Sequence, residues 1–157
     1  MLYEKNYKTY LGDDCLGACI MNYLKYADIE IEQYEIFLIG EGFLLKFDNI
    51  MGVITTNKKY GDIYRESMGK LGLDFLYADC CGFEREFLID AIKGEKAITV
   101  EVKSKLLTYD NIFINGEDSK HCINVIGYSA NNDTVYISDG FVPKSSSEIF
   151  EGWINLE

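Results

Sequence analysis

Apolar residues near the start of the chain recur at the spacing of an α-helix. They form one stripe that can face a core: Leu16, Cys19, Ile20, Tyr23 and Leu24. Asp13 and Asp14 come just before this stripe, where a carboxylate can accept hydrogen bonds from free backbone N–H groups. The pattern predicts a helix from Cys15 to about Tyr26, preceded by an extended or irregular segment over residues 1–12.

Shorter helices and turns are predicted for the rest of the first half. Helical periodicity covers three stretches: residues 32–38, 58–71 and 83–93. A strand is predicted at residues 73–78. Gly40 and Gly42 interrupt an apolar run over residues 39–47, which favours a turn followed by a strand or a tight loop.

The second half of the chain changes to the two-residue period of β-strands. Strands are predicted at residues 97–102, 123–128 and 134–138, and a strand or short helix at 149–156. Residues 131–133 are a hairpin turn signal. Residues 103–119 have no clear period and are interpreted as a long loop, which in a compact domain is often functional. Together the two halves indicate the α+β class, with an N-terminal helix packed on a C-terminal antiparallel sheet.

Composition and charge narrow the class of protein. The chain has 157 residues, of which 48% are hydrophobic, and we expect one domain over residues 1–157. The net charge of −11 makes nucleic acid a poor partner. No apolar run approaches the roughly 20 residues of a membrane span, and the N-terminus lacks an apolar signal-peptide core. We therefore expect a cytoplasmic protein that does not bind membranes, with its five cysteines reduced.

Cys15 is a candidate nucleophile because of its predicted place in the first turn of the helix. There the helix dipole and the unpaired N–H groups favour the thiolate, which is the reactive form of cysteine. The carboxylates of Asp13 and Asp14 oppose this effect, so the sequence leaves the direction of the pKa change open. A small buried thiol at a helix start is the alternative interpretation.

Two further positions complete a candidate nucleophile arrangement. His121 is the only histidine of the chain and stands at the entry of a predicted strand, while Asp139 stands at the exit of its hairpin partner. A short hairpin brings the start of one strand beside the end of the other, so we expect His121 and Asp139 to be in contact. A carboxylate in that place can orient the imidazole and stabilise the imidazolium. With Cys15, these residues predict a Cys–His–Asp catalytic triad.

These residues carry a resemblance to known proteins. The order of a cysteine-bearing helix, then His-x-x-x-Val-x-Gly-Tyr, then Ser-Asp-Gly resembles the papain-like cysteine protease superfamily. Within it, residues 121–128 and 135–139 are similar to the bacterial peptidases that trim double-glycine leader peptides. Asp14-Cys15 together with residues 29–32 and 37–43 resembles the N-terminal domain of butirosin biosynthesis protein H. Papain-like amide synthases of thiotemplated biosynthesis, of the closthioamide type, are related in kind.

The resemblance implies a papain-like fold and a cysteine-dependent acyltransferase or amide synthase. Such an enzyme moves an acyl group from a carrier-protein thioester to an amine through an acyl-cysteine, as in bacterial secondary-metabolite biosynthesis. The implied partners are an acyl or peptidyl carrier protein and a small-molecule amine. No cofactor is implied, because the acyl group arrives on a phosphopantetheine thioester. The alternative is a papain-like cysteine peptidase that cuts peptides or leader peptides.

The sequence departs from the papain-like pattern at the expected oxyanion residue. Such peptidases usually have a Gln about six residues before the nucleophile, where this chain has Thr9 and Tyr10. A thioester needs less oxyanion stabilisation than an amide, so the Cys15 N–H with a Thr9 or Tyr10 hydroxyl is a candidate oxyanion hole. The butirosin-type family also commonly has His where this chain has Asp14. An acyltransferase must exclude water from its acyl-enzyme, and Phe43 and the segment 103–119 are candidates for a wall and a lid.

Three other interpretations of the cysteines and of the site stay open. A structural zinc site would use four residues: Cys15, Cys19, His121 and Cys122. Against it, His121 and Cys122 would point to opposite faces of a strand. A non-catalytic binding module on the same scaffold is the second interpretation. Cys80 and Cys81 are adjacent, and a reduced pair of thiols is expected there rather than a strained disulfide.

Overall fold

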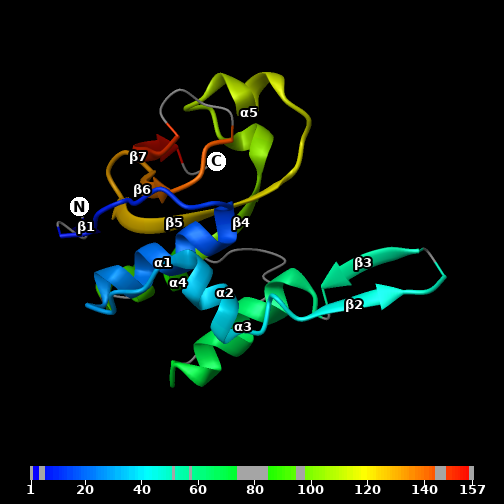
Figure 1. Cartoon of the computed structure of the whole chain (residues 1–157). Helices are drawn as coiled ribbons and strands as arrows, with labels where there is room; N and C mark the ends of the chain where they lie inside the picture. The colour runs from blue at the N-terminus through cyan, green and yellow to red at the C-terminus, as the bar shows by residue number, and fades with distance from the viewer. Residues whose placement is uncertain are drawn as a thin grey trace. The chain divides into compact units, whose positions relative to one another are not determined.

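The computed structural model describes residues 2–3, 6–50, 52–56, 58–73, 85–94, 98–143 and 148–155. The chain divides into two compact units (Figure 1). The first, here called the sheet unit, combines Met1–Glu30 with Cys81–Glu157, and the second, the hairpin unit, is Ile31–Cys80. The expected single domain over residues 1–157 stays a prediction.

The sheet unit is built around one antiparallel sheet. Its strands are β1 (Leu2–Tyr3), β4 (Ile98–Lys103), β5 (Lys120–Ser129), β6 (Thr134–Asp139) and β7 (Phe150–Asn155). β5 is the central strand, with β6 and then β7 on one side. β4 and β1 share the other edge of β5, because β4 pairs with residues 120–125 and β1 with residues 127 and 128.

The helices of the sheet unit are α1 (Cys15–Tyr26), α4 (Arg85–Lys93) and α5 (Asn111–Asn115), with a 3-10 turn η1 (Ser104–Leu106). α1 packs on β5 and is joined to it by Asn124, whose Nδ2 donates to Cys19 O over 2.8 Å. The same amide donates to the Tyr7 hydroxyl and accepts from Thr99 Oγ1, so this fully buried polar side chain is satisfied.

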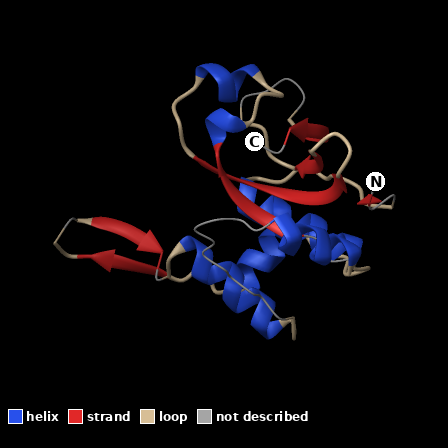
Figure 2. Ribbon diagram, turned by 180° about the vertical axis from the view of Figure 1, so that it is seen from behind, coloured by secondary structure: helices blue, strands red, loops and turns tan. Residues whose placement is uncertain are grey.

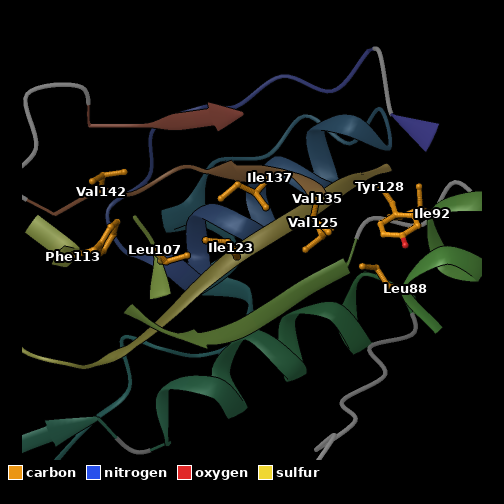
Figure 3. Close-up of a cluster of buried hydrophobic side chains, with 10 residues drawn as sticks. All are labelled: Leu88, Ile92, Leu107, Phe113, Ile123, Val125, Tyr128, Val135, Ile137 and Val142. Carbon is orange, nitrogen blue, oxygen red and sulfur yellow. The ribbon is translucent and has the colours of Figure 1, made fainter. Parts of the chain in front are cut away.

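The hydrophobic core of the sheet unit lies along β5 and β6 and extends to α4 and α5. Its buried members are Leu88, Ile92, Leu107, Phe113, Ile123, Val125, Tyr128, Val135, Ile137 and Val142. Figure 3 shows Leu88 and Ile92 near Tyr128, and Phe113 and Val142 at the other end of the cluster. Neighbouring residues of a strand point to opposite faces, so Ile123 and Val125 face this core while Asn124 faces α1.

Residues 10–12, which lie between β1 and α1, are held by hydrogen bonds to their backbone atoms. Asn22 Oδ1 accepts from Tyr10 N over 2.6 Å, and Asn22 Nδ2 donates to Tyr10 O over 3.0 Å. Gly12 N donates to Gly140 O over 2.9 Å. A Cβ at Gly140 would lie 2.7 Å from both Tyr10 O and Asn22 Nδ2, so only glycine allows this approach.

The hairpin unit pairs two helices with a two-stranded sheet. α2 (Gln33–Ile39) packs on α3 (Tyr60–Lys70), and β2 (Leu45–Asp48) pairs with β3 (Val53–Thr56). The strands extend away from the helix pair (Figure 1 and Figure 2). A Cβ at Gly40 would lie 2.1 Å from Ile63 O, so glycine is required where α2 meets α3.

Most predicted elements are confirmed, with shifted bounds. The helix from Cys15 to Tyr26 has the predicted ends, and the segment 149–156 forms a strand rather than a helix. The segment 103–119 was interpreted as a long loop, but it is not a loop throughout, because it contains η1 and α5. No element was predicted for β3. The predicted strand at residues 73–78 lies outside the described residues except for Leu73.

Candidate active site

Cys15 is the first residue of α1, and the residue before it caps the helix. Asp14 Oδ1 accepts from Gly17 N over 2.7 Å, and Asp14 O accepts from Ala18 N over 2.9 Å. The Cys15 side chain is partly exposed. Its own N–H belongs to the first turn, where an α-helix leaves N–H groups without intrahelical partners. The capping predicted for this site is confirmed, and Asp14 is the residue that provides it.

The predicted contact between His121 and Asp139 is confirmed. His121 lies near the start of β5, and Asp139 ends β6. Imidazole Nε2 lies 2.8 Å from Asp139 Oδ2, and both side chains are buried. The hairpin register explains the contact, because Asn124 pairs with Ser138, one residue before Asp139. With Nε2 bound to Asp139, the other ring nitrogen, Nδ1, is the one that can face Cys15.

The segment between β4 and β5 surrounds this pair with aromatic side chains that the sequence analysis did not identify. Tyr109 donates its hydroxyl to Asp139 Oδ2 over 2.6 Å. Its ring stacks on Phe150 with centroids 3.9 Å apart. The Phe113 ring lies 4.9 Å from that of His121. The segment 103–119 therefore forms part of the wall of the site. Its length was the only feature of the sequence that indicated a functional role for it.

Cys15 has the electrostatic surroundings of a thiolate. A hydrogen bond with the Cys122 thiol is the largest cause that lowers the pKa of Cys15, and together with those of the His121 ring and the Cys122 backbone it outweighs partial burial. The pKa of Cys15 is lowered to about 4. Burial lowers the pKa of His121, but the hydrogen bonds to Asp139 and Cys15 outweigh it and raise this pKa to about 9. The two side chains thus form a thiolate–imidazolium pair at neutral pH.

Cys122 also belongs to the site, although the sequence analysis considered it only as a possible zinc ligand. The hydrogen bond to Cys15, together with burial, raises the pKa of Cys122, so it stays a neutral donor. Its side chain shares the face of β5 with Asn124, whereas His121 lies with Phe113. Cys15 contacts both side chains, although they point to opposite faces of β5.

The hydroxyl of Thr9 and the ring of Tyr10, the two candidate oxyanion residues, have their contacts away from Cys15. The Thr9 hydroxyl is bonded to Ser138 Oγ and Glu151 Oε2, each over 2.7 Å. The Tyr10 ring lies 4.8 Å from the ammonium of Lys25, in the last turn of α1, about ten residues or roughly 15 Å along the helix from Cys15. Phe43 belongs to the hairpin unit, where it is 58% exposed and packs edge-on against Phe37. Its proposed role as a wall stays a prediction.

Two alternatives concern metals and the other cysteines. Within the described residues, no group of three or more His, Cys, Asp or Glu side chains has a metal-binding arrangement. The described cysteines form no disulfide; they are Cys15, Cys19 and Cys122. Cys80 and Cys81 lie outside the described residues.

None of the helices in the described part of the chain has the length and apolarity that a membrane span requires.

Comparison with known proteins identifies the family. The model of the Peptidase_C39 like family matches residues 5–151, a span that contains Cys15, His121 and Asp139. No curated protein and no solved structure was found to match the chain. The match agrees with the fold, in which the Cys15 helix packs on a C-terminal antiparallel sheet, and the family implies an enzyme with a cysteine nucleophile. The chain belongs to the Peptidase_C39 like family, within the papain-like cysteine peptidase superfamily.

Proposed function

We propose that the protein is a cysteine peptidase in which Cys15 is the nucleophile, His121 the general base and acid, and Asp139 the residue that orients His121. One observation carries the proposal: the His121 ring joins Asp139 Oδ2 at 2.8 Å and is also bonded to Cys15, whose pKa is lowered to about 4. A carboxylate, an imidazole and an activated thiol in this order are the parts of nucleophilic catalysis.

The proposed reaction has two halves. The Cys15 thiolate attacks the carbonyl carbon of the scissile bond, a C–S bond forms, and the carbonyl electrons move to oxygen. When this intermediate collapses, the C–N bond breaks and the His121 imidazolium gives its proton to the leaving amine. Water then attacks the acyl-Cys15, its proton passes to His121, and the thiolate leaves. Asp139 stabilises the imidazolium in each half without taking its proton.

The Cys15 backbone N–H is the proposed first donor to the developing oxyanion. It lies in the first turn of α1, and the Asp14 side chain accepts from Gly17 N. A donor in a site without bulk water can contribute about 10²-fold or more to the rate. The Thr9 hydroxyl is already bonded to Ser138 and Glu151, so we do not assign it a part in this step.

Acyl transfer to an amine is the second candidate function. The contacts of Thr9 and Tyr10 favour it, because the Thr9 hydroxyl is bonded to Ser138 and Glu151 and the Tyr10 ring lies against Lys25 in the last turn of α1. A thioester is cleaved with less oxyanion stabilisation than a peptide. In this version a carrier protein presents the acyl group on a phosphopantetheine thioester, a small amine replaces water, and the product is an amide of secondary metabolism. Phe43 is then a candidate for an apolar wall that limits hydrolysis.

Intact mass spectrometry with two probe classes tests the proposal. The protein is mixed with acyl thioesters of N-acetylcysteamine and, separately, with a library of unmodified peptides. We expect an acyl adduct on Cys15, and we expect both reactions to stop in Cys15→Ala. Cys19→Ala is the matched control, because it removes a buried thiol from the same helix. Peptide cleavage by Cys15→Ala at the native rate would contradict the role of Cys15.

The products separate the two functions. A peptidase cuts unmodified peptide and releases free acid from the thioester even at saturating amine. A transferase leaves peptides intact and converts acyl-Cys15 to an amide when amines are added. Absence of both acyl-Cys15 and Cys15-dependent product, with every probe and with Cys15 still reduced, would overturn both candidates and leave a binding module on this scaffold.

A further inference from the structure

The Asp139 carboxylate is shared between two side chains through a single oxygen. Oδ2 accepts from the Tyr109 hydroxyl over 2.6 Å and lies 2.8 Å from His121 Nε2. The other oxygen, Oδ1, accepts from Phe141 N over 2.9 Å. Asp139 is completely buried, so these three donors replace water around the carboxylate.

Tyr109 is held in this position by aromatic contacts on two sides. Its ring stacks on Phe150 of β7 at an interplanar angle of 9°. It also meets Phe113 edge-on, with centroids 5.4 Å apart, and Phe113 in turn contacts the His121 ring. Aromatic pairs of this kind restrict ring position. Packing of the Tyr109 ring therefore fixes the position of its hydroxyl.

Two donors on one oxygen compete for its negative charge. A hydrogen bond from the phenol draws charge away from Oδ2 and weakens the pull of the carboxylate on the imidazolium proton. The phenol itself stays protonated, because burial and the nearby Asp139 charge raise the pKa of Tyr109. The tyrosine can thus act on His121 without touching it, through Asp139.

We propose that Tyr109 is a positioning residue whose hydroxyl fixes the Asp139 carboxylate and moderates its hold on His121. This inference rests on the proposed catalytic pairing of Cys15 and His121. It adds a fourth member, supplied by the segment 103–119, to the Cys15–His121–Asp139 arrangement. Without this hydroxyl, the carboxylate keeps the Phe141 N–H on Oδ1 but has His121 as its only side-chain partner on Oδ2.

Other charged or titratable groups near the site belong to several elements. They are Cys15 and Cys19 of α1, Glu101 of β4, Asp110 before α5, Cys122 of β5 and Asp139 of β6. Removing the Tyr109 hydroxyl leaves all of them in place. The effect on His121 can therefore be assigned to the lost hydrogen bond.

The test uses the fact that the chain contains a single histidine. In Tyr109→Phe the ring and its stacking on Phe150 remain, and only the hydroxyl is lost. We expect the imidazole NMR titration midpoint of His121 to rise by about half a pH unit or more, because Oδ2 is left to the imidazolium. We also expect acylation of Cys15 by an N-acetylcysteamine thioester to slow by about tenfold, the effect of one hydrogen bond to a charged group.

Tyr136→Phe is the matched control. Tyr136 also donates its hydroxyl to a carboxylate, Glu151 Oε1 over 3.2 Å, but this pair is exposed. The control should leave both the His121 midpoint and the acylation rate unchanged. The protein is used without a histidine tag, and near-ultraviolet circular dichroism establishes that each variant is folded.

The outcomes separate this inference from the proposed function. An unchanged or lowered His121 midpoint in folded Tyr109→Phe overturns the inference, even if Cys15 is acylated normally. A raised midpoint in a protein whose Cys15 never accepts an acyl group supports the Tyr109 inference and contradicts the proposed function. If Tyr109→Phe does not fold, the same titration in the folded Tyr109→Leu variant, which also lacks a donor, decides, with a raised midpoint again expected and an unchanged one contrary.

Discussion

Two thiols lie one turn apart on α1 and have opposite chemistry. Cys15 is the first residue of the helix, is partly exposed, and has its pKa lowered to about 4 by the donors Cys122 and His121. Cys19 is 1% exposed, and burial together with the charges of Asp139, Cys15 and Asp14 raises its pKa. The surroundings of the first turn stabilise a thiolate, and those of the second turn stabilise a neutral thiol.

The comparison shows that donors, more than the helix itself, decide which thiol is reactive. A helix dipole contributes typically about 0.3–1 kcal/mol to a charge at its end, too little for a shift of this size. The Cys15 thiol has hydrogen bonds with Cys122 and His121 of β5, whereas the Cys19 thiol is buried and its pKa is raised by that burial and by neighbouring negative charges. The residues of β5, the strand that packs against α1, therefore determine which of the two thiols is ionised.

The largest expected effect comes from neutralising Asp139, which acts on both thiols in opposite directions. In Asp139→Asn the imidazolium loses its partner, and acyl transfer through Cys15 should fall by about 10³-fold. The pKa of Cys15 should rise, and that of Cys19 should fall because a nearby negative charge is removed. Stopped-flow acylation and alkylation mapping measure these changes. An unchanged acylation rate would leave a Cys–His dyad and remove Asp139 from the mechanism.

A smaller effect should come from Cys122, which acts on Cys15 alone. Cys122→Ala removes the thiol donor, so the alkylation midpoint of Cys15 should rise by about one pH unit while Cys19 stays unreactive. Cys122→Ser keeps a donor of similar size and should fall between this variant and the native protein. The same midpoint in all three proteins would show that Cys122 does not stabilise the thiolate.

The smallest effect is expected at Thr9, which touches neither thiol. Thr9→Val removes the bonds to Ser138 and Glu151 and should lower stability by about 1 kcal/mol. The acylation rate should change by less than about twofold, whereas loss of an oxyanion donor costs about 10²-fold or more. Thermal unfolding and acylation kinetics measure the two quantities. A hundredfold loss of rate would show that the Thr9 hydroxyl donates to the oxyanion and would contradict this prediction.

Much of the site could be predicted because it follows local rules. The apolar stripe and the carboxylate before it fixed α1 and the place of Cys15. The length of the hairpin between β5 and β6 was enough to join His121 to Asp139. These inferences need only helical period and strand register, both of which are visible in a single sequence.

The rest of the site depends on packing between distant segments, which a single sequence does not encode locally. Tyr109 and Phe113 lie in a segment without period, and their roles come from contacts with Phe150 and His121. The side chain of Tyr10 is drawn away from Cys15 because Asn22 holds the Tyr10 backbone. The net direction of the Cys15 pKa was open in the sequence, since it is set mainly by the Cys122 thiol, which lies on the strand that packs against the helix.

The rate of alkylation of each cysteine as a function of pH tests the central claim most directly. Iodoacetamide is applied to the folded native protein between pH 3 and pH 10, and modified sites are mapped by mass spectrometry. Cys15 should react half-maximally near its pKa of about 4 and stay the fastest thiol through pH 8, because His121 with its pKa of about 9 remains protonated. Cys19 should stay unmodified over this range. A midpoint for Cys15 at the ordinary thiol value of about 8.5, or faster reaction at Cys80 or Cys81 with Cys15 inert, would contradict the account.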